Sequence, residues 1–501
     1  MRLTFKFNAM LSLLLALALL LAACSSGGSP ERENPTNSEG GDDKPVELVF
    51  AFLNVASIFK DLQKVEDEIN KITQEKINAK IKLMPIDVAA WTQQTNLILA
   101  GSEPLDLIVS SATLNYSSQV AKGQIIALDD LIEQYAPDIK HTMPAEILAG
   151  AKLNGVTYGI PSVRDFATDY GYIARKDILD KHNIDLSTVK TFEDLTAIFQ
   201  ILKEKEPDMY PIVQRSQTVT IVTDMFTGYI DGLGNNIGVL NYDDDSTQLF
   251  NLFESDIYRK YSELAHEWYK KGFVPPDAST SQESNTAMMR ANKAIGYLSN
   301  FKPGFENQEK VANGMEMVAV RITEPVSSSS TAASFMISIA KNSKNPEKAM
   351  EMINLLYTDK DIVNLLDNGI EGIHYVQAGD GTIKLPDGVT EQTYLATQWM
   401  IGNNALAYPW QGTAPDIWDQ MKAFNESAKL SKAIGFVFDT TNVKTEVAAV
   451  QNVLDEYRPG IESGTLDPST IADFNKKLKD AGLDTMIAEK QKQLDAWLQT
   501  Q

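Results

Sequence analysis

The residues that could carry catalytic chemistry do not stand at the spacings that catalysis requires. His266 opens the segment "HEWYK", but Lys270 occupies the place of the second histidine, so two imidazoles cannot share one helical face and hold zinc. The glycines of "GLGNNIG" (232–238) lack the spacing of a dinucleotide-binding loop, and we interpret this segment as a turn. No phosphate-binding loop of the Walker type and no nucleophile elbow occurs in the sequence. We therefore expect neither catalysis nor a cofactor.

One acidic segment matches a calcium-binding loop in part. Asp243, Asp245, Thr247 and Glu254 stand at positions one, three, five and twelve of such a loop, but Gln248 occupies position six, where the sharp turn requires glycine. We interpret the acidic residues as the N-terminal cap of a helix and expect no metal site. The sequence leaves open whether residues 243–254 bind calcium.

Tryptophans gather in one short segment that could recognise sugars. Trp399, Trp410 and Trp418 account for half of the six tryptophans of the chain. A flat indole packs well against the C–H face of a sugar ring. Trp410 lies between Pro409 and Gln411 on an expected loop, which makes it the best candidate for such a platform, with Trp399 as the second. The alternative for each of them is a place in the core.

Polar partners for sugar hydroxyls occur near residue 165. Carboxylates and guanidinium groups make strong hydrogen bonds, and tyrosines add ring faces. The candidates in this stretch are Arg164, Asp165, Asp169, Tyr170 and Tyr172. The alternative is a structural ion pair without ligand contact.

The N-terminus explains why the chain has a single cysteine. Arg2 and Lys6 precede an apolar stretch over 10–23, which is the layout of a secretory signal and is shorter than the roughly 18–20 residues of a membrane-spanning helix. The closing letters "LAAC" resemble a bacterial lipobox, in which the cysteine is lipid-modified and becomes the first residue of the mature chain. We therefore expect Cys24 to be a lipid anchor on the extracytoplasmic face of a cell membrane. The alternative is an ordinary signal peptide that is cut nearby.

Charge and composition narrow the partners of the mature chain. The formal net charge is −22, and removal of residues 1–23 deletes Arg2 and Lys6 but no acid, which gives −24. Such a surface is a poor partner for nucleic acid. Without disulfides, stability must come from cores of ordinary size, and the roughly 455 residues after the polar stretch suit two or three domains. Residues 24–45 are too polar to bury a core, and we expect them to form a disordered tether.

Strands and helices alternate after the tether. The pattern predicts strands over 46–54, 79–86 and 106–111, and helices over 57–76, with Ser57 as N-cap, and over 91–101. This order favours a parallel sheet with helices on both faces. Ligands of such sheets sit beyond the carboxyl ends of the strands, which indicates Asn54, Val55, Ser110 and Ser111 as further binding residues.

A second α/β series runs to about Arg321, and extended segments near 159–171 and 323–334 separate it from the first. We expect an α/β fold with two lobes, each a mainly parallel sheet flanked by helices, and an added helical C-terminal region. The predicted divisions are a signal peptide (1–23), the tether (24–45), lobe 1 (46–165 plus 325–390) and lobe 2 with the C-terminal region (166–324 plus 391–501). The two crossings between the lobes would form a hinge.

These features together resemble a known family. The lipobox, the tether, the strand-first lobe and the segment "NGVTYGIPSVRDFATDYGYIARKDILDKHNID" resemble the extracellular solute-binding lipoproteins of ABC importers, family 1 type. The C-terminal part, from "WMIGNNALAYPWQG" to "LKDAGLDTMIAEKQKQLDAWLQ", is similar to the extra domain of a Gram-positive LipO-like subgroup. The resemblance implies a monomeric clamshell that closes on a carbohydrate, most often an oligosaccharide, and delivers it to a membrane permease.

Two other function classes stay open from the sequence. A surface glycoside hydrolase would also use tryptophan platforms and would need a pair of carboxylates at fixed separation. A sensing or adhesion lipoprotein would share the anchor and the clamshell but would have no transporter. The sequence does not identify the solute.

Overall fold

The computed structural model describes residues 44–55, 57–114, 116–396 and 398–500. The described residues from Pro45 onward form one compact unit. The predicted signal peptide, the anchor Cys24 and the tether up to residue 43 lie outside the described residues. None of the helices in the described part of the chain has both the length and the apolar character that crossing a bilayer requires.

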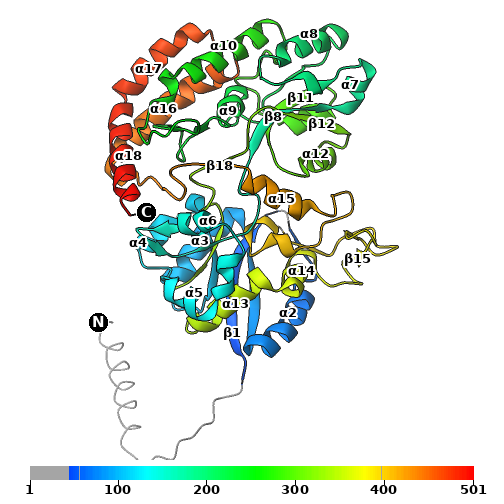
Figure 1. Cartoon of the computed structure of the whole chain (residues 1–501), viewed down its shortest axis with the longest axis vertical. Coiled ribbons are helices and arrows are strands. Elements are labelled where there is room, and N and C mark those ends of the chain that lie inside the picture. Colours follow the sequence, from blue (N-terminus) through cyan, green and yellow to red (C-terminus); the bar gives the residue numbers. More distant parts are fainter. Residues whose placement is uncertain (1–43, 56, 115, 397, 501) are drawn as a thin grey trace, which may run out of the picture. The chain divides into compact units, whose positions relative to one another are not determined.

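The first core surrounds a five-stranded sheet of order β3-β1-β4-β14-β7. β1 pairs in parallel with β3 and β4, whereas β14 runs antiparallel to β4 and β7. Figure 1 shows helices around this sheet. The bounds are β1 Val46–Asn54, β3 Ala79–Asp87, β4 Leu107–Ser110, β7 Ile160–Pro161, β14 Met336–Ile339, α2 Leu62–Ile77, α3 Val88–Ala100, α4 Tyr116–Ala121, α5 Asp129–Tyr135, α6 Ala145–Gly150, α13 Pro346–Thr358 and α14 Lys360–Asn368.

The parallel pairs confirm the predicted strand–helix alternation, but one helix start was wrong. α2 begins at Leu62 after Asp61, so Ser57 is not its N-cap. Instead, β2 (Ile58–Phe59) pairs with β17 (Tyr394–Leu395). This pairing with a strand more than 300 residues away removes the first turn that the local apolar spacing had suggested, because tertiary pairing overrides a weak local preference.

The second core surrounds a three-stranded sheet of order β11-β8-β12. β8 runs antiparallel to both neighbours, so the prediction of a mainly parallel sheet in each lobe is wrong for this sheet. All seven residues of β8 are buried, and such a continuous run is typical of parallel strands. The bounds are β8 Asp169–Arg175, β11 Gly296–Phe301, β12 Met317–Arg321, α7 Lys176–Lys181, α8 Leu195–Lys205, α9 Ile221–Phe226, α10 Asp256–Lys270, α11 Asn285–Arg290 and α12 Phe305–Asn313.

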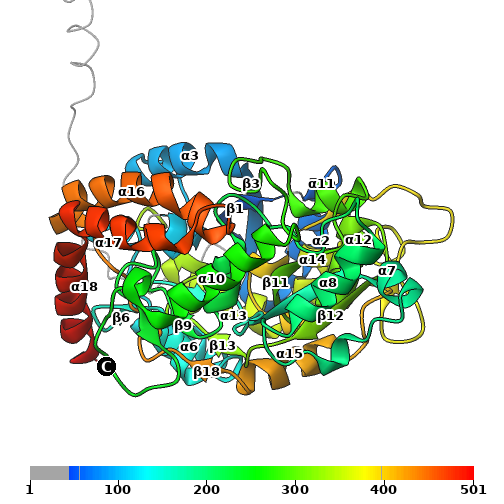
Figure 2. The same cartoon turned by 90° about the horizontal axis from the view of Figure 1, so that it is seen from above.

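Three C-terminal helices complete the second core rather than standing apart from it. Their buried side chains, among them Leu454, Phe474 and Met486, pack in the same cluster as Trp268 of α10. Figure 2 shows α16 and α17 side by side, with α18 across their end. The bounds are α16 Lys444–Glu462, α17 Ile471–Asp480 and α18 Leu483–Leu498.

Short elements connect the two cores. The chain passes from the first core to the second near 163–168, returns near 323–332, and passes again near 427–438 after α15 (Ile417–Glu426). We call these the first, second and third crossings. β13 (Val326–Ser327) and β18 (Lys429–Leu430) pair the second crossing with the third. The remaining bounds are β5 Lys152–Leu153, β6 Val156–Thr157, β9 Ile230–Asp231, β10 Leu240–Asn241, β15 Val376–Gln377 and β16 Ile383–Lys384.

Candidate functional site

The first crossing holds a fixed backbone position between the two cores. Asn425 at the end of α15 accepts hydrogen bonds from the backbone N–H groups of Phe166 and Ala167, at 2.8 and 3.1 Å, and donates to the carbonyl of Arg164 at 2.9 Å. One side chain of α15 therefore satisfies three backbone polar groups of the first crossing. This arrangement fixes where the side chains of Arg164 and Asp165 point.

Arg164 and Asp165 lie at the centre of a mixed polar and aromatic cluster. The Arg164 guanidinium lies over the Trp399 ring, 5.2 Å from its centroid, and its Nε donates to Asp165 Oδ1 at 2.6 Å. Lys302, just after β11, donates to Asp165 Oδ2 at 3.1 Å. Phe335 meets Trp399 edge to face at 4.7 Å between centroids. The cluster thus joins aromatic residues of the first core to a lysine of the second.

Opposing effects act on the charge of Asp165. Burial raises the pKa of this carboxyl, but the charges of Arg164 and Lys302 and their hydrogen bonds outweigh the burial and leave its pKa below the ordinary value. Asp165 therefore stays ionised at neutral pH and holds two cations in place.

A cavity of about 350 Å³ opens beside this cluster, mainly against the second core. Arg215 lies in its wall and makes two hydrogen bonds to Asp224, at 2.5 and 3.1 Å, and a third to Asn300 Oδ1 at 2.7 Å. Tyr297 donates to Glu309 and accepts from Asn313 at 3.0 Å. The lining residues are Arg164, Asp165, Arg215, Asn285, Thr286, Tyr297, Ser299, Asn300, Lys302, Phe305, Gln308, Glu309 and Ala312.

The charges of this cavity balance one another. Arg164, Arg215 and Lys302 supply three cations, and Asp165, Glu309 and the buried Asp224 behind the wall supply three carboxylates. A cavity without excess charge, rich in amide, hydroxyl and charged hydrogen-bonding groups, suits a neutral ligand with many hydroxyl groups. Chemically the arrangement can bind and orient such a ligand.

Three of the predicted residues of the first crossing lie outside this cavity. Tyr172 is fully buried, and its hydroxyl donates to the carbonyl of Pro211 at 2.6 Å. Tyr170 is also buried in the second core. Asp169 accepts from Arg321 at 2.8 Å through Oδ2, whereas its buried Oδ1 has no hydrogen-bond partner among the described residues. Burial raises the pKa of Asp169, although Arg321 opposes this effect.

The predicted residues at the strand ends of the first sheet make local contacts. Asn54 donates to Asp87 at 2.8 Å, at the ends of the paired strands β1 and β3. Ser110 and Ser111 are buried, Ser110 against Ser338 of β14 at 2.6 Å and Ser111 against Thr113 at 2.9 Å. The cavity beside Arg164 does not include these three residues.

Of the three clustered tryptophans, only Trp399 contacts the Arg164 cluster. Trp410 is half-buried, and its indole N–H donates to Asn368 at 2.9 Å. It lines a separate cavity of about 490 Å³ with Lys384 and Gln392. Trp418 donates to the carbonyl of Ala407 at 2.8 Å and lines a cavity of about 490 Å³ between α15, residues 141–144 and the first crossing, where Arg164 also lines it.

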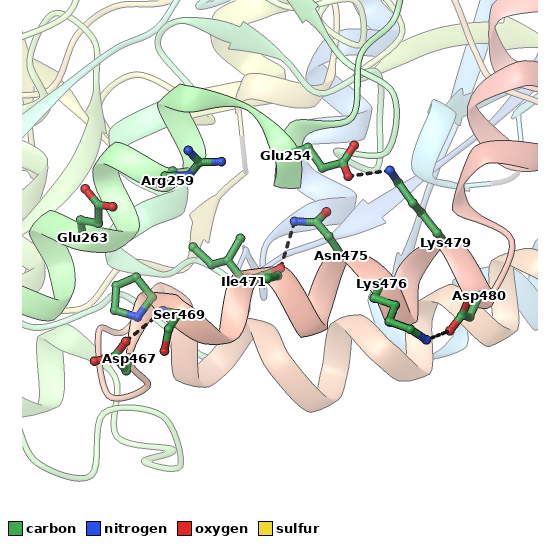
Figure 3. Close-up of a pocket in the computed structure, with 12 residues that line it drawn as sticks. Glu254, Arg259, Glu263, Asp467, Ser469, Ile471, Asn475, Lys476, Lys479 and Asp480 are labelled. Carbon is green, nitrogen blue, oxygen red and sulfur yellow. Dashed lines mark hydrogen bonds and ion pairs between the residues drawn. The ribbon is translucent and has the colours of Figure 1, made fainter.

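A cavity of about 990 Å³ lies away from the crossings. Figure 3 shows it between α10 and α17, lined by charged side chains that pair with one another, as Lys479 does with Glu254 and Lys476 with Asp480. Asp243, the first residue of the partial calcium loop, pairs with Lys429 instead of a shared cation. Within the described residues, no three His, Cys, Asp or Glu side chains gather in a way that could hold a metal ion.

Arg215, Tyr297, Asn300 and Lys302 were not predicted from the sequence. Asn300 and Lys302 lie at the end of β11, and the rule that ligands sit near strand ends could have found them if it had been applied to the second lobe. Arg215 lies in a loop without any local signal, and only its contacts with Asp224 and Asn300 show its role.

Comparisons with known proteins place the chain in a family. Residues 59–362 match the model of "Bacterial extracellular solute-binding protein", and residues 432–499 match a domain of unknown function, DUF3502. A carbohydrate ABC transporter substrate-binding protein of Streptococcus pneumoniae serotype 4 is 28% identical over 493 residues, which cover 96% of each chain.

Solved structures agree with this match. The crystal structure of the N-glycan transport solute-binding protein NgtS from Streptococcus pneumoniae superposes with a TM-score of 0.79 at 25% identity, over 91% of this chain and 99% of that one. The NgtS complex with Man5GlcNAc gives a TM-score of 0.65 at 26% identity, with the same coverage. The predicted two-lobed fold with C-terminal helices is thereby confirmed. Because the family model covers more than half of the chain, the chain belongs to the bacterial extracellular solute-binding proteins, a family of binding proteins rather than enzymes.

Proposed function

We propose that this protein is the solute-binding component of an ABC importer and captures an oligosaccharide at the cavity beside Arg164. The observation that carries the proposal is the charge-balanced cavity at the first crossing, with Trp399 and Phe335 next to it. The relatives support the carbohydrate class, since one is a carbohydrate ABC transporter substrate-binding protein and NgtS has been crystallised in complex with Man1GlcNAc and Man5GlcNAc. A glycan that contains mannose and N-acetylglucosamine is therefore the first ligand to test.

The cavity alone is small for a long glycan, and the aromatic residues extend the surface. The Trp399 ring lies beneath the Arg164 guanidinium, and Trp410 lines a separate cavity formed by residues 384–389, 392 and 410–411. A side-chain carbon placed on Gly412, two residues after Trp410, would lie 3.7 Å from the side-chain amide of Asn307 on α12. Asn307 in turn precedes Gln308 of the cavity wall. We propose that sugar units of one oligosaccharide occupy both places, with Trp410 and Trp399 as stacking residues.

The binding proposal is tested by isothermal titration with Man5GlcNAc, kestose and glucose. Lys302→Met removes a cavity cation, and a lost hydrogen bond to a charged group costs about 1.5–3 kcal/mol, which predicts a roughly tenfold or larger rise in Kd. Lys310→Met is the matched control, because Lys310 lies on α12 outside the cavity, half-exposed and paired with Glu316. Equal affinity of the Lys302 variant and the parent would remove this cavity from the proposal. No measurable binding of any oligosaccharide would contradict the solute class.

We also propose closure of two lobes about the crossings. Lobe 1 comprises the first core, and lobe 2 comprises the second core with α16–α18. Residues Tyr394, Met400 and Ile401, assigned to lobe 2 from the sequence, pack in the first core, so the proposed boundary moves from 390 to near 407. A few residues at element ends can absorb such a rotation. Small-angle scattering with and without Man5GlcNAc should show a smaller radius of gyration on binding, and an unchanged radius would contradict closure.

The attachment to the membrane rests on the lipobox-like sequence. We propose that Cys24 carries the lipid and that the tether holds the protein near its permease partner. Replacement of Cys24 by Ala should release the protein from the membrane fraction of the cells. Equal retention of variant and parent would exclude this anchor.

A further inference from the structure

One lysine is fully buried at the place where the C-terminal helix α18 meets the second core. Lys490 is 0% exposed, whereas Lys492 on the same helix has a side chain that is 75% exposed. The Lys490 ammonium donates to Asn235 Oδ1 at 2.6 Å and to the carbonyl of Ile237 at 2.5 Å. Longer contacts of 3.3 Å reach the carbonyls of Leu233 and Gly238. Four oxygen atoms of one loop therefore surround a single cation.

The loop that surrounds Lys490 has an unusual backbone. Residues 232–238 connect β9 to β10, and Leu233, Gly234, Asn236 and Gly238 all have positive φ angles, at 46, 89, 59 and 66°. The left-handed conformation is strained for a bulky non-glycine residue, so the surrounding structure must hold Leu233 in place. The contacts of the ammonium with the loop carbonyls provide such a restraint.

The same loop is joined to the second crossing through Asp231. This buried carboxylate accepts from the backbone N–H of Leu233 at 3.0 Å. It also accepts from the backbone N–H of Ser329 at 2.8 Å and from its hydroxyl at 3.0 Å. Ser329 belongs to the second crossing, and its carbonyl accepts from Gly435 of the third crossing at 2.8 Å. A continuous chain of contacts thus runs from α18 to two crossings.

α18 also packs directly on the third crossing. Leu494, one turn after Lys490, shares a small core with Leu233, Ala433 and Phe436. Between these last two residues, Ile434 packs in the first core. A side-chain carbon placed on Gly435 would lie 2.0 Å from the carbonyl oxygen of Gly150 on α6. Residues 433–436 therefore lie between the first core and α18, and the backbone of Gly435 approaches that of Gly150 too closely for a side chain.

We propose that α18 is a clamp on the hinge and that Lys490 is the positioning residue through which it sets the rest position of the two lobes. The clamp acts through the loop 232–238, Asp231 and Ser329 on the second crossing, and through the shared small core on the third. This assigns a role to the C-terminal domain of unknown function: it biases the balance of open and closed forms. Because affinity includes the free energy of closure, a residue far from the ligand then changes the affinity.

The inference rests on the proposed two-lobed closure but is tested first without a ligand. The one cysteine of the chain allows site-specific spin labelling after Cys24→Ser, with Lys71→Cys on α2 and Lys260→Cys on α10 as exposed label sites. Lys490→Met keeps the length of the side chain but removes the donor. We expect it to shift the distance distribution of the unliganded protein, and we expect Lys492→Met to match the parent.

A second variant separates positioning from mere folding. Ser329→Ala removes the hydroxyl bond to Asp231 and keeps the backbone N–H bond, so it weakens the far end of the same chain of contacts. It should shift the distribution in the same direction, and the two substitutions combined should shift it less than the sum of their single effects. If Lys490→Met fails to fold, Asn235→Ala takes its place, because it removes the 2.6 Å contact from the surface side of the loop. A folded Lys490→Met variant with the parent distribution, or additive effects with Ser329→Ala, would overturn the clamp.

Titration with Man5GlcNAc then measures the consequence for binding. The coupling expected between distant sites corresponds to about a fivefold or larger change in Kd for Lys490→Met. A shifted distribution with unchanged Kd would overturn the role of α18 in affinity. If the parent does not bind Man5GlcNAc, the proposed ligand is wrong. The distance distributions measured without ligand then test the clamp by themselves.

Discussion

The hydrogen bonds of one buried carboxylate indicate how strongly the C-terminal helices are held to the second core. Glu462, at the end of α16, is 0% exposed and accepts five hydrogen bonds. Arg458 donates to both oxygens at 2.7 and 3.0 Å, Tyr258 of α10 donates at 3.2 Å, and the hydroxyls of Thr220 and Thr223 donate at 2.8 and 3.1 Å. The donors come from α9, α10 and α16, so one side chain joins three helices.

Replacement of Glu462 by Gln keeps its shape but removes the charge and turns an acceptor into a donor. Loss of one partner of a buried ion pair costs about 3–5 kcal/mol of unfolding free energy. The Arg458 side chain is 22% exposed, so water can hydrate part of its unpaired charge in the variant. We therefore expect a loss at the lower end of this range, about 3 kcal/mol of unfolding free energy. For a cooperative unit of roughly 200 residues this lowers the Tm by about 6–12 °C.

Calorimetry of the parent and the variant measures this loss directly. Glu456→Gln is the matched control, since Glu456 lies on the same helix, is 60% exposed and pairs with Lys477 at 3.1 Å at the surface. Surface pairs contribute about 0–1 kcal/mol, so the control should melt within a few degrees of the parent. A Glu462→Gln protein that melts as the parent does, or as the control does, would refute the view that these helices belong to the second core.

Three further outcomes are expected. Trp399→Ala should weaken Man5GlcNAc binding about tenfold in titration calorimetry, since it removes the ring beneath Arg164, and unchanged affinity would place Trp399 in the core only. Trp410→Ala should weaken the same binding with little change in the Tm of the free protein; a large loss of Tm would show that its bond to Asn368 is structural. The pKa of Asp165 is lowered in the folded state, so its ionised form stabilises the fold above the unfolded pKa of about 3.9, and this stabilisation is lost as pH falls through the folded pKa. Asp165→Asn should therefore have a lower unfolding free energy than the parent at pH 7 and a smaller difference from the parent in acid. An equal difference at pH 3 and pH 7 would contradict this.

Local sequence patterns determined the strand–helix order of the first lobe and favoured one class of function among three. The apolar runs of β1 and β4 and the stripes of the helices between them require burial on both faces, so a parallel sheet followed from chain order alone. The zinc, dinucleotide, Walker and nucleophile-elbow motifs are defined by residues close along the chain, so their absence can be read from the sequence, and it pointed away from those classes of enzyme. The spacing of Leu483, Met486, Lys490 and Leu494 even places Lys490 on the buried face of α18, although a lysine there suggests the opposite.

Tertiary structure alone decided which charges meet. Arg215 contacts Asn300 across 85 residues, and Lys302 contacts Asp165 across 137. The antiparallel second sheet and the third crossing likewise depend on pairings between distant segments. A local apolar pattern predicts that one face of a strand or helix is buried, but it does not predict which segment covers that face. Any apolar partner of suitable shape satisfies the same requirement. The cavity beside Arg164 and the contacts of α18 with the crossings are built from such long-range pairings, and for that reason they follow only from the folded chain.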